Sequence, residues 1–169
     1  MRITRRHVLA TTAAVAAAGT LGVGATGVRW WNRAPGEGLV VLAPDEHAFI
    51  QAVAEAWMPR GGTPELSGAD AGVGDFLDET LQAVNPLNQK LLKLLMQVLD
   101  DSTLPTHLSA FRNLGLKQRQ NVLRGWLQHD SFLVRSAVTG LVLLMSVGWT
   151  THPEVAEVLR PSMRCGYGR

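Results

Sequence analysis

Apolar side chains recur every three or four residues along most of the chain beyond residue 43, which is the period of an amphipathic α-helix. The pattern predicts five longer helices, over residues 44–58, 73–84, 86–100, 116–129 and 132–149. It also predicts a short segment over 106–111 and a last short helix that ends at Leu159. No run alternates with a period of two, and no internal repeat is visible. The predicted fold is therefore all-α, an irregular bundle of five to seven helices.

Proline and glycine residues mark where these helices begin and end. Pro44 suits the first position of a helix, and Asp45 and Glu46 after it favour the positive end of the helix dipole. Residues 29–43 are expected to form a linker. Residues 59–72 contain four glycines and two prolines, so they are predicted to form a loop. Its length makes this loop the strongest candidate for a functional one.

The helix predicted over residues 132–149 is the most apolar of the set. It is part of a stretch of 16 residues without charge, from Ser136 to Thr151, which is short for a membrane span. We interpret this helix as the central helix of the core, with a second membrane segment as the alternative. Gly140 and Gly148 predict that neighbouring helices approach it closely.

The first 28 residues have the pattern of a twin-arginine export signal. The residues that fit this pattern are Thr4, Arg5, Arg6, Val8 and Leu9. An apolar run over residues 8–28 follows and is about long enough to span a bilayer as a helix. The run fits either a signal cleaved near Val23-Gly24-Ala25 or a retained membrane anchor. In both cases the helical domain, residues 44–169, is expected in the periplasm or on the periplasmic face of the cytoplasmic membrane.

The charge balance gives no indication of a nucleic acid partner. The formal net charge is +2, from 16 basic and 14 acidic residues. Three of the arginines lie in the export signal, and subtracting them leaves 13 basic residues against 14 acidic ones. No basic stripe interleaved with aromatic residues is present in the rest of the chain. On the helix over 116–129, Lys117, Arg119 and Arg124 are expected to face the solvent.

The sequence contains no recognisable catalytic or metal-binding motif. No two of the five histidines are three or four residues apart, as ligands on one helix face would be. Cys165 is the only cysteine, which excludes an intrachain disulfide and a cysteine zinc site. Asp75, Asp78 and Glu79 open a predicted helix, where they suit the helix dipole better than acid–base work. We therefore predict no catalytic, metal or cofactor site in this chain.

The order of several short segments along the chain indicates a protein family. After the twin-arginine signal come Ala43–Glu46, Trp57-Met58-Pro59, Ala69–Asp78, Phe111–Leu114, Gly148–Val155 and Gly166-Tyr167. In this order they resemble the gluconate 2-dehydrogenase subunit 3 family. The segment Gly148–Val155 is similar to that family's Gly-Tyr-x-x-His-Pro-Glu-Val, with Trp149 in place of the tyrosine. The resemblance covers about residues 1–167.

The resemblance implies a non-catalytic small subunit. Such subunits bind a large FAD-dependent dehydrogenase of the glucose-methanol-choline type and carry it, already folded, through the twin-arginine translocase. A cytochrome subunit often completes the complex, and the FAD belongs to the large partner rather than to the small subunit. An exported helical module that binds an apolar ligand is the alternative function.

Aromatic residues are the candidates for contact with such a partner, because tryptophan and tyrosine are enriched at interface hot spots. The candidates are Trp57, Trp126, Trp149 and Tyr167. For the three tryptophans, a position in the hydrophobic core is the alternative.

Overall fold

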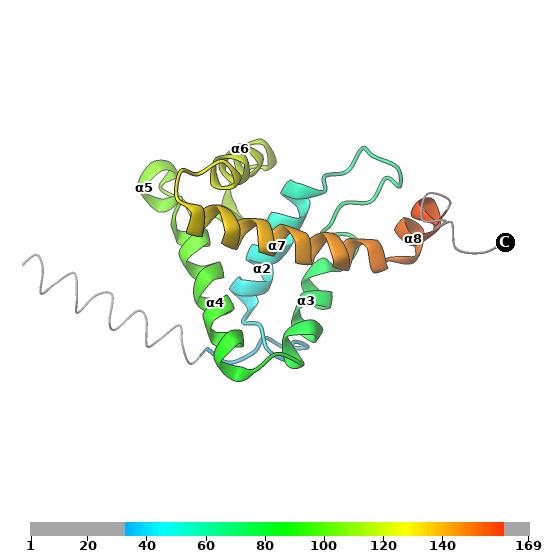
Figure 1. Ribbon diagram of the computed structural model, residues 1–169, viewed down its shortest axis with the longest axis horizontal. Helices are drawn as coiled ribbons and strands as arrows, with labels where there is room; N and C mark the ends of the chain where they lie inside the picture. Colours follow the sequence, from blue (N-terminus) through cyan, green and yellow to red (C-terminus); the bar gives the residue numbers. More distant parts are fainter. Residues whose placement is uncertain (1–32, 161–169) are drawn as a thin grey trace, which may run out of the picture. The chain divides into compact units, whose positions relative to one another are not determined.

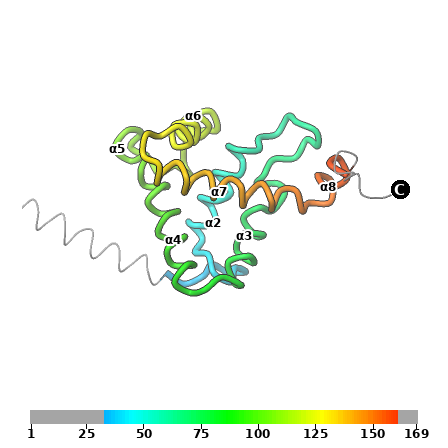
Figure 2. The backbone as a smooth tube through the Cα atoms, viewed as in Figure 1, coloured from blue at the N-terminus to red at the C-terminus, as the bar shows by residue number. Residues whose placement is uncertain are grey.

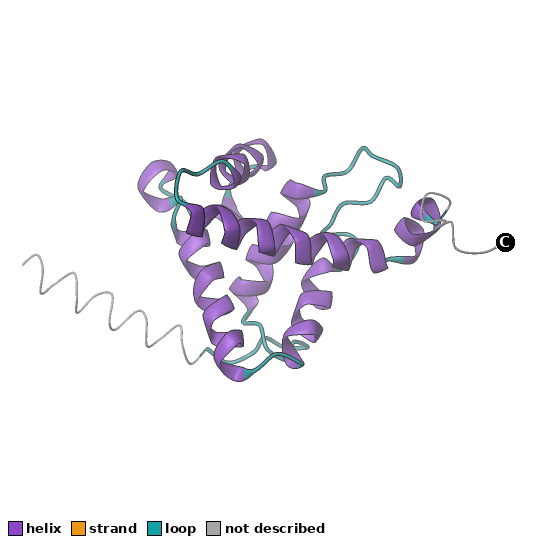
Figure 3. Ribbon diagram, in the orientation of Figure 1, coloured by secondary structure: helices purple, strands orange, loops and turns teal. Residues whose placement is uncertain are grey.

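The computed structural model describes residues 33–160, which are helical apart from their connections (Figure 1). The elements in chain order are α2 (Pro44–Trp57), α3 (Val73–Gln82), α4 (Pro86–Asp101), α5 (Leu104–His107), the 3-10 helix η1 (Phe111–Asn113), α6 (Leu116–Leu127), α7 (Phe132–Thr151) and α8 (Pro153–Leu159). No strand occurs among the described residues, as Figure 3 shows, so the all-α prediction is confirmed.

The five longer helices lie within two residues of their predicted ends. The short segment predicted over 106–111 divides into α5 and η1. The export-signal residues, the apolar run over 8–28, Cys165 and Tyr167 lie outside the described residues. The predictions made for them are therefore not addressed by the structure.

Helix α2 is the centre of the helical unit. It contacts α3, α4, α6, α7 and η1, and Phe49, Ile50 and Val53 on it are fully buried. Figure 2 shows α7 crossing α2, with α3 and α4 flanking it. The prediction that the helix over 132–149 is the central one is therefore wrong. Three buried alanines on α2 allow neighbouring helices to approach it from several sides, and this is what makes α2 the central element.

Helix α7 buries one face and exposes the other. The buried residues of α7 are Val138, Leu141, Val142, Met145 and Gly148. Only 28% of the most apolar 18-residue stretch of the helix is buried. Since apolar residues occupy both faces, α7 covers the core and also presents apolar side chains outward.

The two glycines predicted to permit close helix approach differ in their surroundings. A methyl group on Gly148 would lie 2.5 Å from the ring of Phe76, so α3 and α7 are in close contact here, as predicted. No atom lies within 4 Å of the position that a methyl group on Gly140 would take. The prediction is wrong for Gly140 because this residue lies on the outward face of α7.

Three charged side chains fix the segment that leads into α2, and we call them the linker clamp. The carboxylate of Asp78 on α3 accepts hydrogen bonds from the backbone N–H groups of residues 40–42, at 2.6 to 2.9 Å. Glu46 accepts from the N–H of Ala43 at 2.8 Å. Lys93 on α4 lies 3.2 Å from Glu46 and donates to the carbonyl of residue 41 at 2.8 Å. The end of the predicted linker, residues 40–42, is therefore part of the compact unit, which starts at Ala34.

Arg119 on α6 faces α2 rather than the solvent. Its guanidinium lies 2.9 Å from the carboxylate of Glu55 and donates to the carbonyl of Ala52 at 3.2 Å. The predicted outward orientation of Arg119 is therefore wrong, because acceptors on α2 compensate the charge at the helix interface. Lys117 and Arg124 are exposed, as predicted.

Candidate partner-docking surface

Trp126, one of the candidate interface residues, contributes to the interior. Its indole stacks on the ring of Phe111, with centroids 4.9 Å apart and planes at 29°. Phe111 in turn meets Phe49 of α2 edge-on at 5.7 Å. The three rings link α6, η1 and α2, and edge-on and offset contacts of this kind add stability beyond area burial. Trp126 thus fits the core alternative better than the interface one.

Trp57 is the exposed member of the candidate set. It ends α2, and 42% of its surface is accessible. Its Nε1–H donates to Oγ of Ser146 on α7 at 3.0 Å, and this hydroxyl donates to the carbonyl of Val142 at 2.7 Å. The indole is therefore held in one orientation while a large part of its surface faces the solvent.

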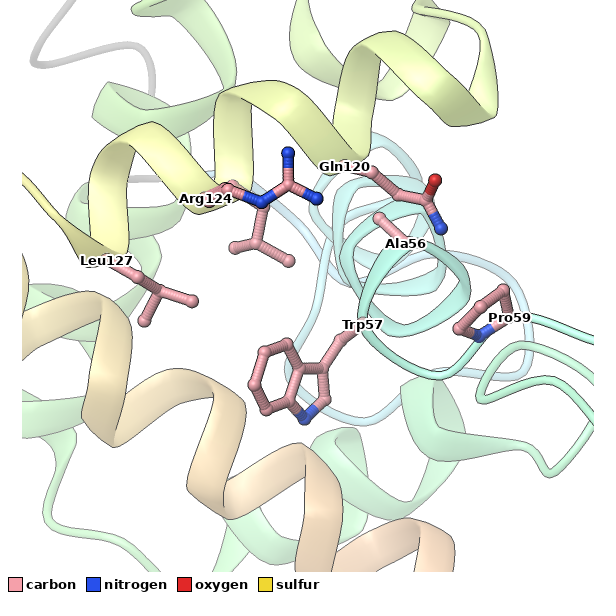
Figure 4. Close-up of a pocket in the computed structure, with 7 residues that line it drawn as sticks. Ala56, Trp57, Pro59, Gln120, Arg124 and Leu127 are labelled. Carbon is pink, nitrogen blue, oxygen red and sulfur yellow. The ribbon is translucent and has the colours of Figure 1, made fainter. Parts of the chain in front are cut away.

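A groove of about 310 Å³ begins at Trp57 and runs between the end of α2 and helix α6 (Figure 4). The lining residues are Ala56, Trp57, Pro59, Gln120, Leu123, Arg124 and Leu127. In Figure 4 the indole lies beside the ribbon of α7, and Leu127 lies on the α6 side. The wall of the groove is mixed: five apolar residues line it together with two polar side chains, Gln120 and Arg124, from α6.

The outward face of α7 carries exposed apolar side chains near Ser146, the residue that binds the indole of Trp57. Leu143 and Val147 precede and follow Ser146, and they are 60% and 54% exposed. No charged residue occurs on α7 after Arg135. We call Trp57, Leu143 and Val147, together with the groove, the α7 docking surface.

Among the described helices, α7 alone is long and apolar enough, by length and composition, to cross a membrane. It has 20 residues, and its mean hydropathy reaches 1.7. One face of α7 nevertheless packs against α2, α3 and α6. That packing favours the role of a domain helix with one unpartnered face over that of a membrane span.

The predicted functional loop, residues 59–72, leaves the groove at Pro59 and is fixed at its base. Arg60 makes two hydrogen bonds to Asp70, at 2.7 and 2.6 Å, and the hydroxyl of Ser67 donates to the same carboxylate at 2.6 Å. The bonds from Arg60 and Ser67 hold the pKa of Asp70 well below its usual range. The tip, residues 61–65, extends from this base and is mostly exposed (Figure 1). A loop with a fixed base presents its tip to a partner at a small cost in entropy.

Trp149 lies on α7 one turn beyond Ser146 and is only partly exposed. Its Nε1–H is buried and has no hydrogen-bond acceptor. Of the candidate residues that the structure describes, Trp57 alone belongs to the α7 docking surface. Leu143 and Val147 were missed as candidates because the sequence indicated only that their helix is apolar.

His47 and Asp75 form a histidine–carboxylate pair elsewhere on the unit, with Nε2 and Oδ1 2.9 Å apart. They border a pocket of about 440 Å³ whose remaining wall is residues 36–39 and Pro44. That wall supplies no nucleophile and no second histidine. Residues 33–160 contain no group of three or more side chains placed to hold a metal ion. The pair is a polar contact between α2 and α3.

Comparison with known proteins agrees with the resemblance seen in the sequence. The family model described as gluconate 2-dehydrogenase subunit 3 matches residues 44–158. No curated protein and no solved structure matches the chain. The matched range runs from the first residue of α2 into α8 and includes Trp57, the loop and all of α7. The chain therefore belongs to the gluconate 2-dehydrogenase subunit 3 family.

Proposed function

We propose that this chain is a non-catalytic small subunit that binds the large, FAD-dependent catalytic subunit of a dehydrogenase through the α7 docking surface. The observation that carries the proposal is the unpartnered apolar face of α7 beside the oriented indole of Trp57, on a chain whose family is described as a dehydrogenase subunit. Contiguous apolar surface of this kind marks sites of protein–protein contact.

The chemistry of the surface suits a protein partner. Leu143 and Val147 provide apolar area, and Trp57 provides a large side chain whose orientation is already fixed by Ser146. Because that orientation is fixed before binding, little side-chain entropy is lost on association. Gly140, on the same face, leaves open space in which a helix of the partner can approach closely.

We assign the FAD to the partner, a dehydrogenase of the glucose-methanol-choline type, and export to the signal that contains Arg5 and Arg6. Twin-arginine export moves folded proteins, so a partner that must take up FAD in the cytoplasm can cross the membrane bound to this chain. The complex would then act in the periplasm or on the periplasmic face of the membrane, where a cytochrome subunit can join it. Residues 8–28 would hold the complex at the membrane if the signal is retained.

The test is affinity purification of the chain from membrane and periplasmic fractions of its native host. We expect a large subunit with a flavin absorbance spectrum to co-purify. Replacing Arg5 and Arg6 by lysine should leave both proteins in the cytoplasm. The double variant Leu143→Glu/Val147→Glu should be exported without the large subunit, because two carboxylates would have to be desolvated in the interface.

The matched control is Leu104→Glu on α5, an exposed leucine outside the α7 docking surface. This variant should keep the large subunit, and circular dichroism should show that all the variants are folded. A colourless chain that is abundant but alone would contradict the proposal. An apolar ligand in the Trp57 groove would then be the function to test, since the groove lies at the lower end of the size range of small-molecule sites.

A further inference from the structure

The outward side of α6 is polar and carries two cations. Its exposed residues are Lys117, Gln118, Asn121, Arg124 and Gly125, which we call the α6 strip. At 100° per residue they fall within an arc of about 120°. Arg124, at one edge of this arc, also lines the Trp57 groove, and Figure 4 shows it on the α6 side of that groove. The strip therefore adjoins the α7 docking surface.

The two cations of the strip have no carboxylate partner among the described residues. Helix α6 itself contains no aspartate or glutamate. Its third cation, Arg119, faces inward and lies 2.9 Å from the carboxylate of Glu55. Arg124 instead donates to the neutral amide oxygen of Asn121 at 3.2 Å, and Lys117 makes no ion pair within the part of the chain that is described. The strip therefore presents uncompensated positive charge to a partner that approaches it.

Gly125 is an independent indication that something lies against the strip. It stands inside α6, where glycine weakens a helix relative to alanine. No neighbouring atom of the described chain lies within 4 Å of the position that a methyl group on Gly125 would take. Packing within the chain thus gives no reason for a glycine here. A partner whose backbone comes close to α6 does give one.

The number of cations favours protein carboxylates over a lipid surface as the partner. Segments that bind anionic lipid carry clusters of about four to eight basic residues, and the strip has two. Lys117 and Arg124 are seven residues apart, so they lie on one side of α6, about 10.5 Å apart along its axis. Two carboxylates on one protein segment can meet both. A polar rim beside an apolar centre is also the ordinary anatomy of a protein–protein interface.

We propose that the α6 strip binds an acidic segment of the dehydrogenase subunit, with one carboxylate at Arg124, beside the Trp57 groove, and a second at Lys117. This inference rests on the proposed function, because the segment belongs to the partner assigned there. It adds that the partner is recognised by charge as well as by apolar contact. Charges at the rim of an interface orient the partner and suppress wrong ones.

The experiment is affinity purification of the full-length chain from its native host, with single substitutions in the strip. Arg124→Glu should lower the captured large subunit by about tenfold or more, because like charges would then face each other. Lys117→Glu should lower it less, and Arg124→Lys should retain it. The matched control is Arg160→Glu, at an exposed cation that follows Glu154 and Glu157 on α8, and it should leave the captured amount unchanged.

Gly125→Leu separates contact with the partner from support of the fold. The added side chain would occupy space that is open in the free chain, so the thermal unfolding temperature of the free chain should not fall. The captured large subunit should nevertheless fall by about tenfold, because the side chain would hold the partner's backbone away from α6. A fall in the unfolding temperature, with capture unchanged, would mean that Gly125 serves the fold.

A zero-length carbodiimide, which joins a lysine amine to a carboxylate in contact with it, identifies the occupant in the Arg124→Lys variant. We expect cross-links from positions 117 and 124 to aspartate or glutamate of the large subunit, and none from position 160 in Arg160→Lys. Absence of both expected cross-links would overturn the proposal. If the chain then bound phosphatidylglycerol vesicles and Arg124→Glu did not, an anionic lipid surface would be the occupant instead.

The same samples distinguish failure of this inference from failure of the proposed function. If Arg124→Glu captured as much large subunit as the natural chain while Leu143→Glu/Val147→Glu captured none, the acidic segment would be ruled out and the proposed function would stand. If the natural chain itself captured no large subunit, both would be wrong.

Discussion

At the scale of single residues, the carboxylate of Asp78 fixes the backbone that leads into α2. It is 3% exposed and accepts hydrogen bonds from three consecutive backbone N–H groups, those of residues 40–42. Burial alone would raise its pKa, but the three hydrogen bonds outweigh burial and lower the pKa below its usual value. The ionised form of Asp78 is therefore the form that the fold stabilises.

Replacing Asp78 by Asn should lower the free energy of unfolding by about 2–4 kcal/mol, because the amide turns a donor toward N–H groups and leaves at least one of them unpaired. The measurement is urea unfolding of the purified chain, followed by tryptophan fluorescence. Asp75→Asn is the matched control. Its side chain is 68% exposed, so the loss of its contact with His47 should cost less than about 1 kcal/mol. If the two variants lost equal amounts of unfolding free energy, the role given to Asp78 would be contradicted.

The same carboxylate predicts a dependence of stability on pH. Since the folded-state pKa of Asp78 is lowered, its stabilisation is complete above the unfolded-state value of about 3.9 and is lost as the pH falls through the folded value. The difference in unfolding free energy between the natural chain and Asp78→Asn should therefore be constant near neutral pH. It should shrink below about pH 4. A difference that stays constant down to the acid transition would argue against this account.

The sequence did not indicate these residue roles, because the partners are distant along the chain. The N–H groups bound by Asp78 are 36 to 38 residues away, and the carbonyl bound by Arg119 is 67 residues away. Helical periodicity reports which residues share a face of one helix, and it carries no information on what that face meets. A charged residue at such a position is therefore indistinguishable in the sequence from a solvated one.

At the scale of elements, local sequence signals were sufficient to predict where the helices begin and end. Pro86 begins α4, and Asn85 before it accepts a hydrogen bond from the N–H of Leu87 at 2.9 Å, so this boundary is encoded within three residues. The position of α7 was not predictable in the same way. Apolar residues occupy both of its faces, so the pattern could not tell a central helix from one that covers the core and has an outward apolar face.

The two glycines of α7 provide a test of which face is inward. Gly148→Ala places a methyl group 2.5 Å from the ring of Phe76 and should lower the free energy of unfolding by about 1–3 kcal/mol. Gly140→Ala meets no atom and should raise it by up to about 1 kcal/mol, because alanine is the better helix former. Both are measured by thermal unfolding with circular dichroism. If Gly140→Ala destabilised the free chain as much as Gly148→Ala, the assignment of the faces would be wrong.

At the scale of the whole molecule, the outward apolar face of α7 has no cover within the described chain. For the α7 docking surface, the sequence indicated Trp57, and it also indicated the loop over 59–72 that leaves the groove at Pro59, because an aromatic residue and a glycine-rich stretch are recognisable on their own. Leu143 and Val147 could not be indicated, since an exposed leucine and a buried one are the same in a sequence. The family is described as a subunit of a dehydrogenase, and in such an assembly another subunit would cover this face.

The α7 docking surface is exposed in the free chain and would be covered in the complex, so substitutions on it should affect the two states differently. In the free chain Leu143 and Val147 are exposed, so the double variant Leu143→Glu/Val147→Glu should change its unfolding free energy by no more than about 0.5 kcal/mol per site. In the complex the dehydrogenase would stabilise the natural chain by mass action, by about 2.7 kcal/mol at a hundredfold excess over the dissociation constant. Added large subunit should therefore raise the thermal unfolding temperature of the natural chain and leave that of the variant unchanged. If the transition temperature rose equally for the natural chain and the variant, the dehydrogenase would bind another face. If the free variant were less stable than the natural chain, these side chains would support the fold.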